Sequence, residues 1–387
     1  MESIFLVFTV CITLAFILSE LFYRLGYPRV VGQLLAGVVL GLPFIKDYFT
    51  SGGTSFIDSL GNIGVVFLML LVGTEVKVHA LMKVSGKALL LAVVGYLIPL
   101  TLGFAFMTLL GFETLTAVIV GICLAISAEA VTIDILLEYD LLDTKFGTMI
   151  MEAGMIDDFL GVFSLAAVIT VLHGGGVDEL MSLPGDFLFF ILLAYVIGFT
   201  VLPRAAKAVW KEKSEAAVFS LAVIFGLIIV LLSESFGLSS VIGAFVAGII
   251  IQISIKNRLE EKEIVESLSV VTFGLVIPFF FIDVGMNLDL LKAAWNLPFI
   301  AVLTSIALAG KIFAANLMGM LYRIRRVDRV VIGWAMNPRG AVELVIANIA
   351  RTNGLISAEV FSAVVSMTII AALVSPVMFR RALDRRQ

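Results

Sequence analysis

Long apolar segments separated by short polar connections run through the chain. A helix that spans a bilayer needs about 20 mainly apolar residues, because the hydrocarbon core is about 30 Å thick and a helix rises about 1.5 Å per residue. The pattern therefore predicts an all-α membrane protein with 13 transmembrane helices. The expected helices cover residues 3–25, 28–44, 56–76, 88–110, 114–138, 144–172, 183–210, 216–236, 239–255, 264–286, 297–321, 327–350 and 359–379.

The composition excludes a water-soluble globular protein. Of the 387 residues, 61% are hydrophobic and 14% are charged, against about 25% charged in an average soluble domain. Membrane lipid is therefore the expected surrounding. The net charge is −4, so we expect no binding of nucleic acid, which needs a basic face. The sequence contains no glycine-rich phosphate-binding motif, so we expect no nucleotide site. We expect no cofactor.

The distribution of lysine and arginine predicts how the chain is oriented. Positive charge is in excess on the cytoplasmic side of membrane proteins. Of the 26 basic residues, 21 lie in the connections after odd-numbered predicted helices or in the C-terminal tail, and three lie on the opposite side. We therefore expect a multi-pass protein of the cell inner (plasma) membrane, with its N-terminus outside and its C-terminus in the cytoplasm.

The chain also resembles itself at a shift of about 211 to 214 residues. Three segment pairs show the resemblance: 18–22 with 232–236, 32–37 with 243–248, and 72–73 with 284–285. The first six predicted helices then correspond to the last six, and the seventh joins them as a linker. Because the displacement of seven helices is odd, equivalent helices run in opposite directions. Two inverted six-helix repeats of this kind are typical of secondary transporters.

In inverted-repeat transporters, the substrate site lies near mid-membrane where paired helices are interrupted. The fifth and twelfth predicted helices are such a pair, because polar residues and a Pro-Arg-Gly run interrupt them. The residues at these breaks are Ser127, Glu129 and Thr132 in the fifth helix and Pro338, Arg339 and Glu343 in the twelfth. A simple proline kink in the twelfth helix is the alternative.

Two roles are open for the polar side chains at these breaks. Arg339 and an acidic residue can neutralise the dipoles of the half-helix ends, and this structural role is favoured over direct ion ligation. Ser127 and Thr132 can supply oxygen ligands to an ion, although hydroxyls in membrane helices commonly bond to backbone carbonyls of their own helix.

Asp157 and Asp158 lie near the centre of the sixth predicted helix. An ionisable side chain at this depth is costly and is interpreted as functional by default. Adjacent residues on a helix project about 100° apart, so both carboxylates can reach one cavity. A carboxylate can hold either a proton or a hard cation, and competition between the two is the minimum chemistry of a cation/proton exchanger. The alternative is a purely structural pairing.

Lys311 lies near the middle of the eleventh predicted helix and is the expected counter-ion of this acidic pair. It can act as a proton carrier, or only as an ion-pair partner that steadies the helices. The sequence favours neither role.

Three motifs carry a resemblance to a known family: residues 156–161 (IDDFLG), Gly310-Lys311 and Pro338-Arg339-Gly340. With these motifs the chain resembles the cation:proton antiporter 2 branch of the monovalent cation/proton antiporters, and within it the NapA-type sodium/proton antiporters. The resemblance implies the NhaA/NapA-like antiporter fold and a homodimer. It implies a dimerisation part at about 1–80 and 214–288, a linker helix at about 183–213, and a moving core at about 81–174 and 289–387.

The same resemblance assigns roles to the central residues. It makes Asp158 the principal carrier of ion and proton, pairs Asp157 with Lys311, and implies elevator-type alternating access. The chain departs from the family pattern at Glu129, where relatives mostly carry small or hydroxyl residues, and at Ala341, where an acidic residue is common and Glu343 follows two positions later.

The predicted function is secondary active exchange of a monovalent cation for protons. Na+ is the expected cation, with Li+ as a further one, and the double-Asp form resembles electrogenic members with a role in pH homeostasis. A K+/H+ antiporter of the same family and a cation channel are the alternatives. An enzyme, specifically an intramembrane aspartyl protease, is disfavoured. Such a protease needs its two catalytic Asp residues on different helices, whereas Asp157 and Asp158 lie on one.

Overall fold

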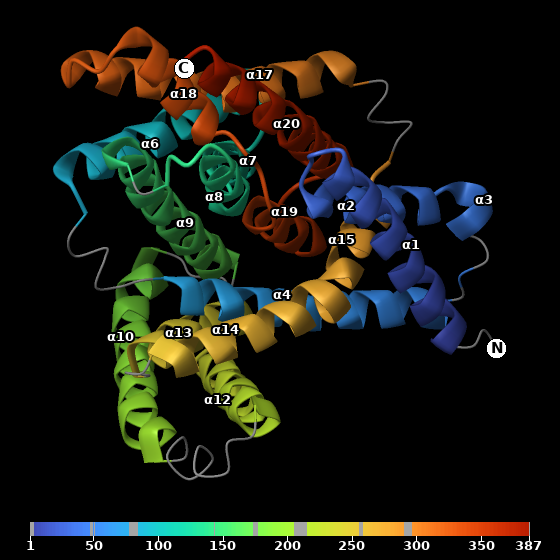
Figure 1. The fold of residues 1–387 in the computed structure, drawn as a ribbon. Helices are drawn as coiled ribbons and strands as arrows, with labels where there is room; N and C mark the ends of the chain where they lie inside the picture. Colours follow the sequence, from blue (N-terminus) through green and yellow to red (C-terminus); the bar gives the residue numbers. More distant parts are fainter. Residues whose placement is uncertain are drawn as a thin grey trace. The chain divides into compact units, whose positions relative to one another are not determined.

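A computed structural model describes residues 4–46, 49, 51–76, 84–142, 144–172, 177–204, 215–254, 258–289 and 296–386, and these ranges are built from helices joined by short connections (Figure 1). The last part of the predicted linker helix, residues 205–213, lies outside them. The helices are α1 (Ile4–Arg24), α2 (Arg29–Leu40), α3 (Pro43–Lys46), α4 (Ser51–Glu75), α6 (Gly86–Leu109), α7 (Thr114–Ala125), α8 (Glu129–Glu138), α9 (Lys145–Leu172), α10 (Val177–Thr200), α12 (Glu215–Ser235), α13 (Ser240–Ser254), α14 (Arg258–Val271), η1 (Thr272–Val276), α15 (Ile277–Met286), α17 (Leu297–Leu321), α18 (Arg326–Ala335), α19 (Val342–Thr352) and α20 (Ala358–Asp384).

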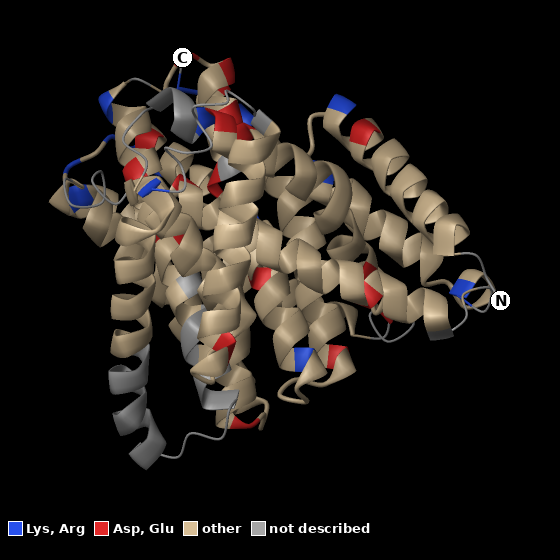
Figure 2. Ribbon diagram, turned by 90° about the horizontal axis from the view of Figure 1, so that it is seen from below, with Lys and Arg blue, Asp and Glu red and all other residues tan. Residues whose placement is uncertain are grey.

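Among the described helices, seven are long and apolar enough to cross a membrane. Shorter apolar helices accompany them, including α2, α7 and α13. Most residues along the described helices are neither acidic nor basic (Figure 2). The prediction of an all-α membrane protein is therefore confirmed, while the number of 13 spans stays a prediction.

The chain divides into two compact units. The first contains Met1–Phe8, Thr50–Ala80 and Ala166–Phe280, and α4 packs on α13 within it. The two helices meet at Gly73 and Gly248, where a Cβ added to either glycine would collide with backbone atoms of the other helix. The π-helical turn η1 lies just before Pro278, whose ring and missing N–H disturb the preceding turn of a helix.

The second unit contains Thr9–Phe49, Leu81–Leu165 and Phe281–Gln387. Here α6 packs against α7 and α17, and α17 also packs against α18 and α20. Two of these helices have a serine N-cap. Ser85 of α6 accepts a hydrogen bond from the Ala88 N–H, and Ser357 of α20 accepts one from the Val360 N–H. Each serine satisfies a backbone donor that the first helical turn leaves open.

Both predicted helix interruptions are present in the second unit. Helix α7 ends at Ala125 and α8 begins at Glu129, with Ile126 and Ala128 in extended conformations. Helix α18 ends at Ala335 and α19 begins at Val342. The two breaks touch, because the Ala128 N–H donates to the Pro338 carbonyl at 2.8 Å. Gly340 permits this approach, since a Cβ there would lie 2.6 Å from that of Ala128.

Candidate functional site

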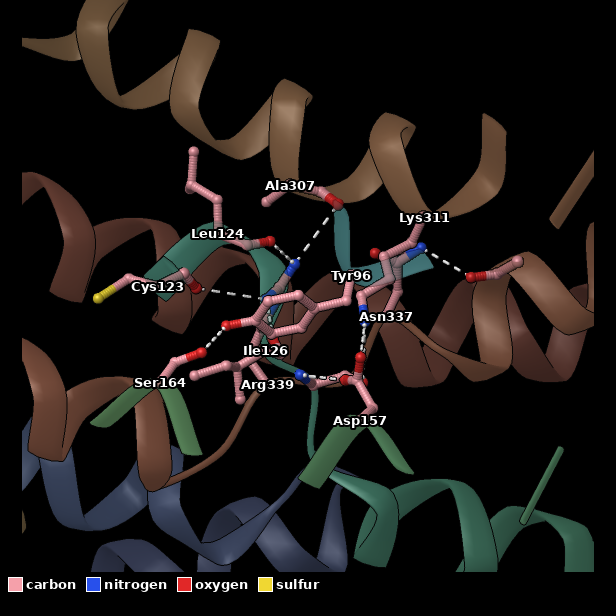
Figure 3. Close-up of polar contacts among 12 residues, drawn as sticks. Tyr96, Cys123, Leu124, Ile126, Asp157, Ser164, Ala307, Lys311, Asn337 and Arg339 are labelled. Carbon is pink, nitrogen blue, oxygen red and sulfur yellow. Dashed lines mark hydrogen bonds and ion pairs between the residues drawn. The ribbon is translucent and has the colours of Figure 1, made fainter. Parts of the chain in front are cut away.

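A buried ion pair lies beside the break between α7 and α8 (Figure 3). Lys311 Nζ of α17 is 2.7 Å from Asp157 Oδ1 of α9, and both side chains are 0% exposed. The Ser127 N–H donates to Asp157 Oδ2 at 2.9 Å, and the Ser127 hydroxyl donates to the same oxygen. Lys311 Nζ also lies 3.4 Å from the Ser127 hydroxyl. A buried ion pair is tolerated when further hydrogen bonds satisfy its polar atoms, and here both carboxylate oxygens have donors.

Asp158 follows Asp157 on α9 but has a different environment. Its side chain is half-buried, whereas that of Asp157 is fully buried. It remains close enough to Lys311 for a Coulombic interaction. The two adjacent carboxylates therefore differ. Asp157 is fixed by its bonds to Lys311 and Ser127, and Asp158 keeps accessible surface near Lys311.

Arg339, in the break between α18 and α19, reaches the end of α7. Its guanidinium donates to the Ile126 carbonyl, to the Leu124 carbonyl at 2.8 Å and to the Cys123 carbonyl at 3.4 Å. It is completely buried. The last carbonyls of a helix lack intrahelical partners and carry partial negative charge, so a cation at this position stabilises the end of α7.

Glu343 lies in the first turn of α19 and is also completely buried. Its Oε1 accepts a hydrogen bond from the Gly340 N–H at 2.8 Å. A carboxylate is favourable near the positive end of a helix dipole. The backbone carbonyl of Glu343 accepts a hydrogen bond from the Cys123 thiol at 3.6 Å, so α19 is also tied to α7.

Glu129 and Thr132 lie at the start of α8 and line a small pocket that Ser127 also borders. Glu129 packs against Gly154 of α9, and a Cβ at that glycine would overlap the Glu129 carboxylate. The Thr132 hydroxyl donates to the Ala335 carbonyl at 2.5 Å, which gives the last residue of α18 a hydrogen-bond partner. Thr132 thus bonds across to another helix rather than to its own.

Of the predicted site residues, the structure brings Asp157, Lys311 and Ser127 into direct contact. Pro338 contributes its carbonyl to the crossing of the two breaks. Arg339 binds backbone carbonyls at the end of α7, and Glu343 binds the Gly340 N–H within the break before α19. Glu129 and Thr132 line the small pocket that Ser127 also borders.

A second polar contact, which the sequence does not predict, lies beside the ion pair. The hydroxyls of Tyr96 on α6 and Ser164 on α9 share a hydrogen bond at 2.5 Å, and the Tyr96 side chain is buried (Figure 3). One signal points to Tyr96: Gly95-Tyr96 matches Gly310-Lys311 at a shift of 215 residues, close to that of the internal repeat.

Asn337, within the second break, is a further structural residue of the site. Its amide donates to the Gly333 carbonyl at 2.8 Å and to the Leu308 carbonyl at 3.2 Å. The backbone carbonyl of Asn337 accepts a hydrogen bond from the Ser375 hydroxyl at 3.1 Å. These contacts fasten the end of α18 to α17 and α20.

The arrangement can perform one kind of chemistry directly. A carboxylate with accessible surface can exchange a proton for a small cation, and the ammonium of Lys311 is close enough to Asp158 for a Coulombic interaction. The surrounding backbone is interrupted on both sides, which is tolerated at membrane depth where it is buried in protein or lines a cavity. The site therefore fits ion and proton binding.

Comparisons with known proteins agree with this chemistry. The sequence profile of the family described as "Sodium/hydrogen exchanger, transmembrane" matches residues 9–385. The chain is 27% identical to the Na+/H+-K+ antiporter GerN of Bacillus cereus over 94% of this chain and 92% of that protein. It is also 27% identical to the Na+/H+ antiporter of Enterococcus hirae, over 94% of this chain and 93% of that one.

A solved structure shares the fold. The sodium proton antiporter MjNhaP1 from Methanocaldococcus jannaschii, determined at pH 8, superposes with a TM-score of 0.73. The alignment covers 97% of each chain at 16% sequence identity.

Proposed function

Because the chain belongs to the sodium/hydrogen exchanger family of cation:proton antiporters, we propose that it exchanges Na+, and also Li+, for protons across the plasma membrane. The exchange is a secondary active process driven by ion gradients, and it serves pH homeostasis. The names of its relatives in Bacillus cereus and Enterococcus hirae support the sodium assignment.

The contrast between the two adjacent aspartates is the observation that carries this proposal. Asp157 accepts hydrogen bonds from Ser127 and is paired with Lys311. Asp158 keeps accessible surface. In our proposal Asp158 releases a proton when it binds the cation, and it takes a proton again when the cation leaves. Asp157 holds Lys311 beside it.

We further propose that exchange is electrogenic and that Lys311 contributes to its voltage dependence. If Lys311 releases a proton when Asp158 binds the cation, each cycle moves net charge across the membrane. Lys311→Gln removes that group and should make exchange insensitive to an imposed membrane potential. Equal sensitivity in Lys311→Gln and the parent protein would show that Lys311 carries no counted proton.

Alternating access in our proposal uses 13 transmembrane helices arranged as two inverted repeats. Local packing supports the repeat. Gly37 of α2 meets Gly285 of α15, and a shift of 211 or 212 residues carries these two positions onto Gly248 and Gly73, which meet each other as well. A second pair of contacts agrees: Ser19 donates to the Arg29 carbonyl, and its repeat partner Ser233 donates to the Ser239 carbonyl.

The remaining parts of the proposal concern assembly. We propose a homodimer formed through residues 1–80 and 214–288, against which a core of residues 81–174 and 289–387 moves as an elevator. The N-terminus faces outside and the C-terminus faces the cytoplasm. The distribution of basic residues supports this orientation.

Proteoliposomes with an imposed pH gradient test the central proposal. Addition of Na+ or Li+ should collapse the gradient in vesicles that hold the parent protein, and Asp158→Asn should abolish the collapse. Asp58→Asn, which removes an exposed carboxylate from α4, is the matched control and should keep full activity. Equal collapse with Asp158→Asn and the parent protein would overturn the assignment of Asp158.

K+/H+ exchange is the second candidate function, because the name of the relative GerN includes K+. The same vesicles distinguish the two functions. Collapse of the gradient by K+ at lower concentration than by Na+ would favour the potassium function.

A further inference from the structure

A cavity with apolar walls and a basic rim lies between α18 and α20 in the second unit. Its volume is about 280 Å³. It is lined by Arg326, Val327, Val330, Trp334, Met378, Arg381, Ala382 and Arg385. Three arginines thus surround a cavity whose other walls are apolar, and none of the described residues that line it is acidic.

The arginines of this cavity differ from their neighbours in how their charge is balanced. Arg325 and Arg386 both pair with Asp328, at 2.8 and 2.7 Å. Arg380 pairs with Glu138 at 3.0 Å.

The three rim arginines, Arg326, Arg381 and Arg385, lie in the same part of the chain and are exposed. Within the described residues, none of them has a carboxylate at ion-pair distance. Basic and acidic residues gather near the C-terminus (Figure 2). Of the described carboxylates there, Asp328 and Glu138 pair with other arginines, and Asp384 accepts a hydrogen bond from the Tyr139 hydroxyl. The rim therefore keeps its positive charge.

We propose that this cavity binds one anionic phospholipid, with the phosphate on the three arginines and part of an acyl chain against Val330, Trp334 and Met378. Arginine binds phosphate through paired N–H groups and is suited to this contact. Basic pockets between transmembrane helices are suited to anionic lipid headgroups. A zwitterionic lipid carries an ammonium beside its phosphate and so leaves the net positive charge of the rim uncompensated, and a free phosphate would leave the apolar wall uncovered.

Because of where the cavity lies, a bound lipid would stabilise the packing of α18. Helix α18 is one half of an interrupted helix, and its last carbonyl is bonded to Thr132 of α8. A lipid held between α18 and α20 joins this short half-helix to a continuous one. Binding to the folded state alone raises the unfolding midpoint in proportion to the logarithm of ligand concentration.

Thermal unfolding of the detergent-solubilised protein tests the proposal. Phosphatidylglycerol should raise the midpoint by a few degrees, and phosphatidylcholine with the same acyl chains should not. The variant Arg326→Gln/Arg381→Gln/Arg385→Gln should lose most of the rise, while its midpoint without added lipid stays that of the parent protein. The control variant Arg24→Gln/Arg204→Gln/Arg323→Gln removes three exposed arginines outside the cavity and should keep the full rise.

Three results would overturn the proposal. An equal rise in the triple cavity variant and the parent protein would place any lipid effect elsewhere. An equal rise with phosphatidylcholine would show that charge is not recognised. An equal rise with inorganic phosphate or glycerol phosphate would show that the apolar wall is not used. Should the triple variant unfold, native mass spectrometry of Arg381→Gln replaces it, and unchanged retention of phosphatidylglycerol would count against the site.

Discussion

The two helix breaks at the centre of the second unit arise in different ways. The break between α18 and α19 contains Pro338 and Gly340, two residue types that disfavour a helix by themselves. The break between α7 and α8 contains neither residue. Its backbone groups are instead bound by side chains and backbone from elsewhere: Asp157 accepts from the Ser127 N–H, Arg339 donates to the carbonyls of α7, and Pro338 accepts from Ala128. The α18/α19 break thus arises from its own residues, whereas the α7/α8 break depends on contacts with other segments.

This difference predicts which substitutions matter. Contacts that hold the α7/α8 break should be costly to remove, because each leaves a buried polar group without a partner. Residues that merely favour the α18/α19 break should be tolerated, since several contacts maintain it together. Four substitutions examine this comparison, and all are checked by unfolding in detergent.

The largest effect is expected from Asp157→Ala. It removes the acceptor of the Ser127 N–H and leaves the ammonium of Lys311 buried without its counter-ion. Losing one partner of a buried ion pair costs about 3–5 kcal/mol. The double variant Asp157→Leu/Lys311→Met removes both charges and should recover a large part of that loss. A double variant less stable than Asp157→Ala would contradict the role given to the pair.

Arg339→Ala should come next. It leaves the carbonyls of Leu124 and Ile126 buried without their donor, and an unsatisfied buried group costs about 1–3 kcal/mol. Arg323→Ala, which removes an exposed arginine, is the control and should leave the unfolding free energy unchanged. If the two variants were equally stable, the end of α7 would not depend on Arg339.

A smaller loss, about 1 kcal/mol, is expected from Thr132→Val. The change keeps the shape of the side chain and removes its hydrogen bond to the Ala335 carbonyl. Thr101→Val serves as the comparison, because Thr101 is exposed and its hydroxyl bonds to carbonyls of its own helix. Thr132→Val should be the more destabilising of the two, and the reverse order would count against a link between α8 and α18.

Pro338→Ala should have the smallest effect. Gly340, its hydrogen bond to Glu343 and the hydrogen bond from Ala128 all stay in place. Replacing a compatible proline costs about 0.4–1 kcal/mol through the entropy of the unfolded chain. A loss as large as that of Asp157→Ala would mean that Pro338 alone creates the break, and that the two breaks differ less than the contacts indicate.

Sequence reasoning predicted the features that stand out against an apolar background. Asp157, Lys311 and Arg339 are conspicuous because charge is expensive in lipid, and Pro338 removes a backbone donor from a helix and is followed by a glycine two positions later. The pairing of Asp157 with Lys311 was expected from the resemblance and is present in the structure. The interruption near Ser127 was also expected, from its polar run.

Other features could not be predicted because they depend on how distant helices pack. Nothing local in residues 126–128 shows that Arg339 and Pro338 will bind their backbone. Tyr96 and Ser164 are ordinary residues in apolar helices until packing places their hydroxyls together. The basic cavity likewise requires α18 and α20 to lie side by side, so that arginines from separate segments share one rim.

Proton release on cation binding tests the central claim most directly. The detergent-solubilised protein is held in weakly buffered solution, and the pH is recorded as NaCl or choline chloride is added. Our account predicts that Na+ releases protons from the parent protein and from Asp58→Asn, that choline does not, and that Asp158→Asn releases none. Undiminished release from Asp158→Asn would contradict the exchange of proton for cation at Asp158.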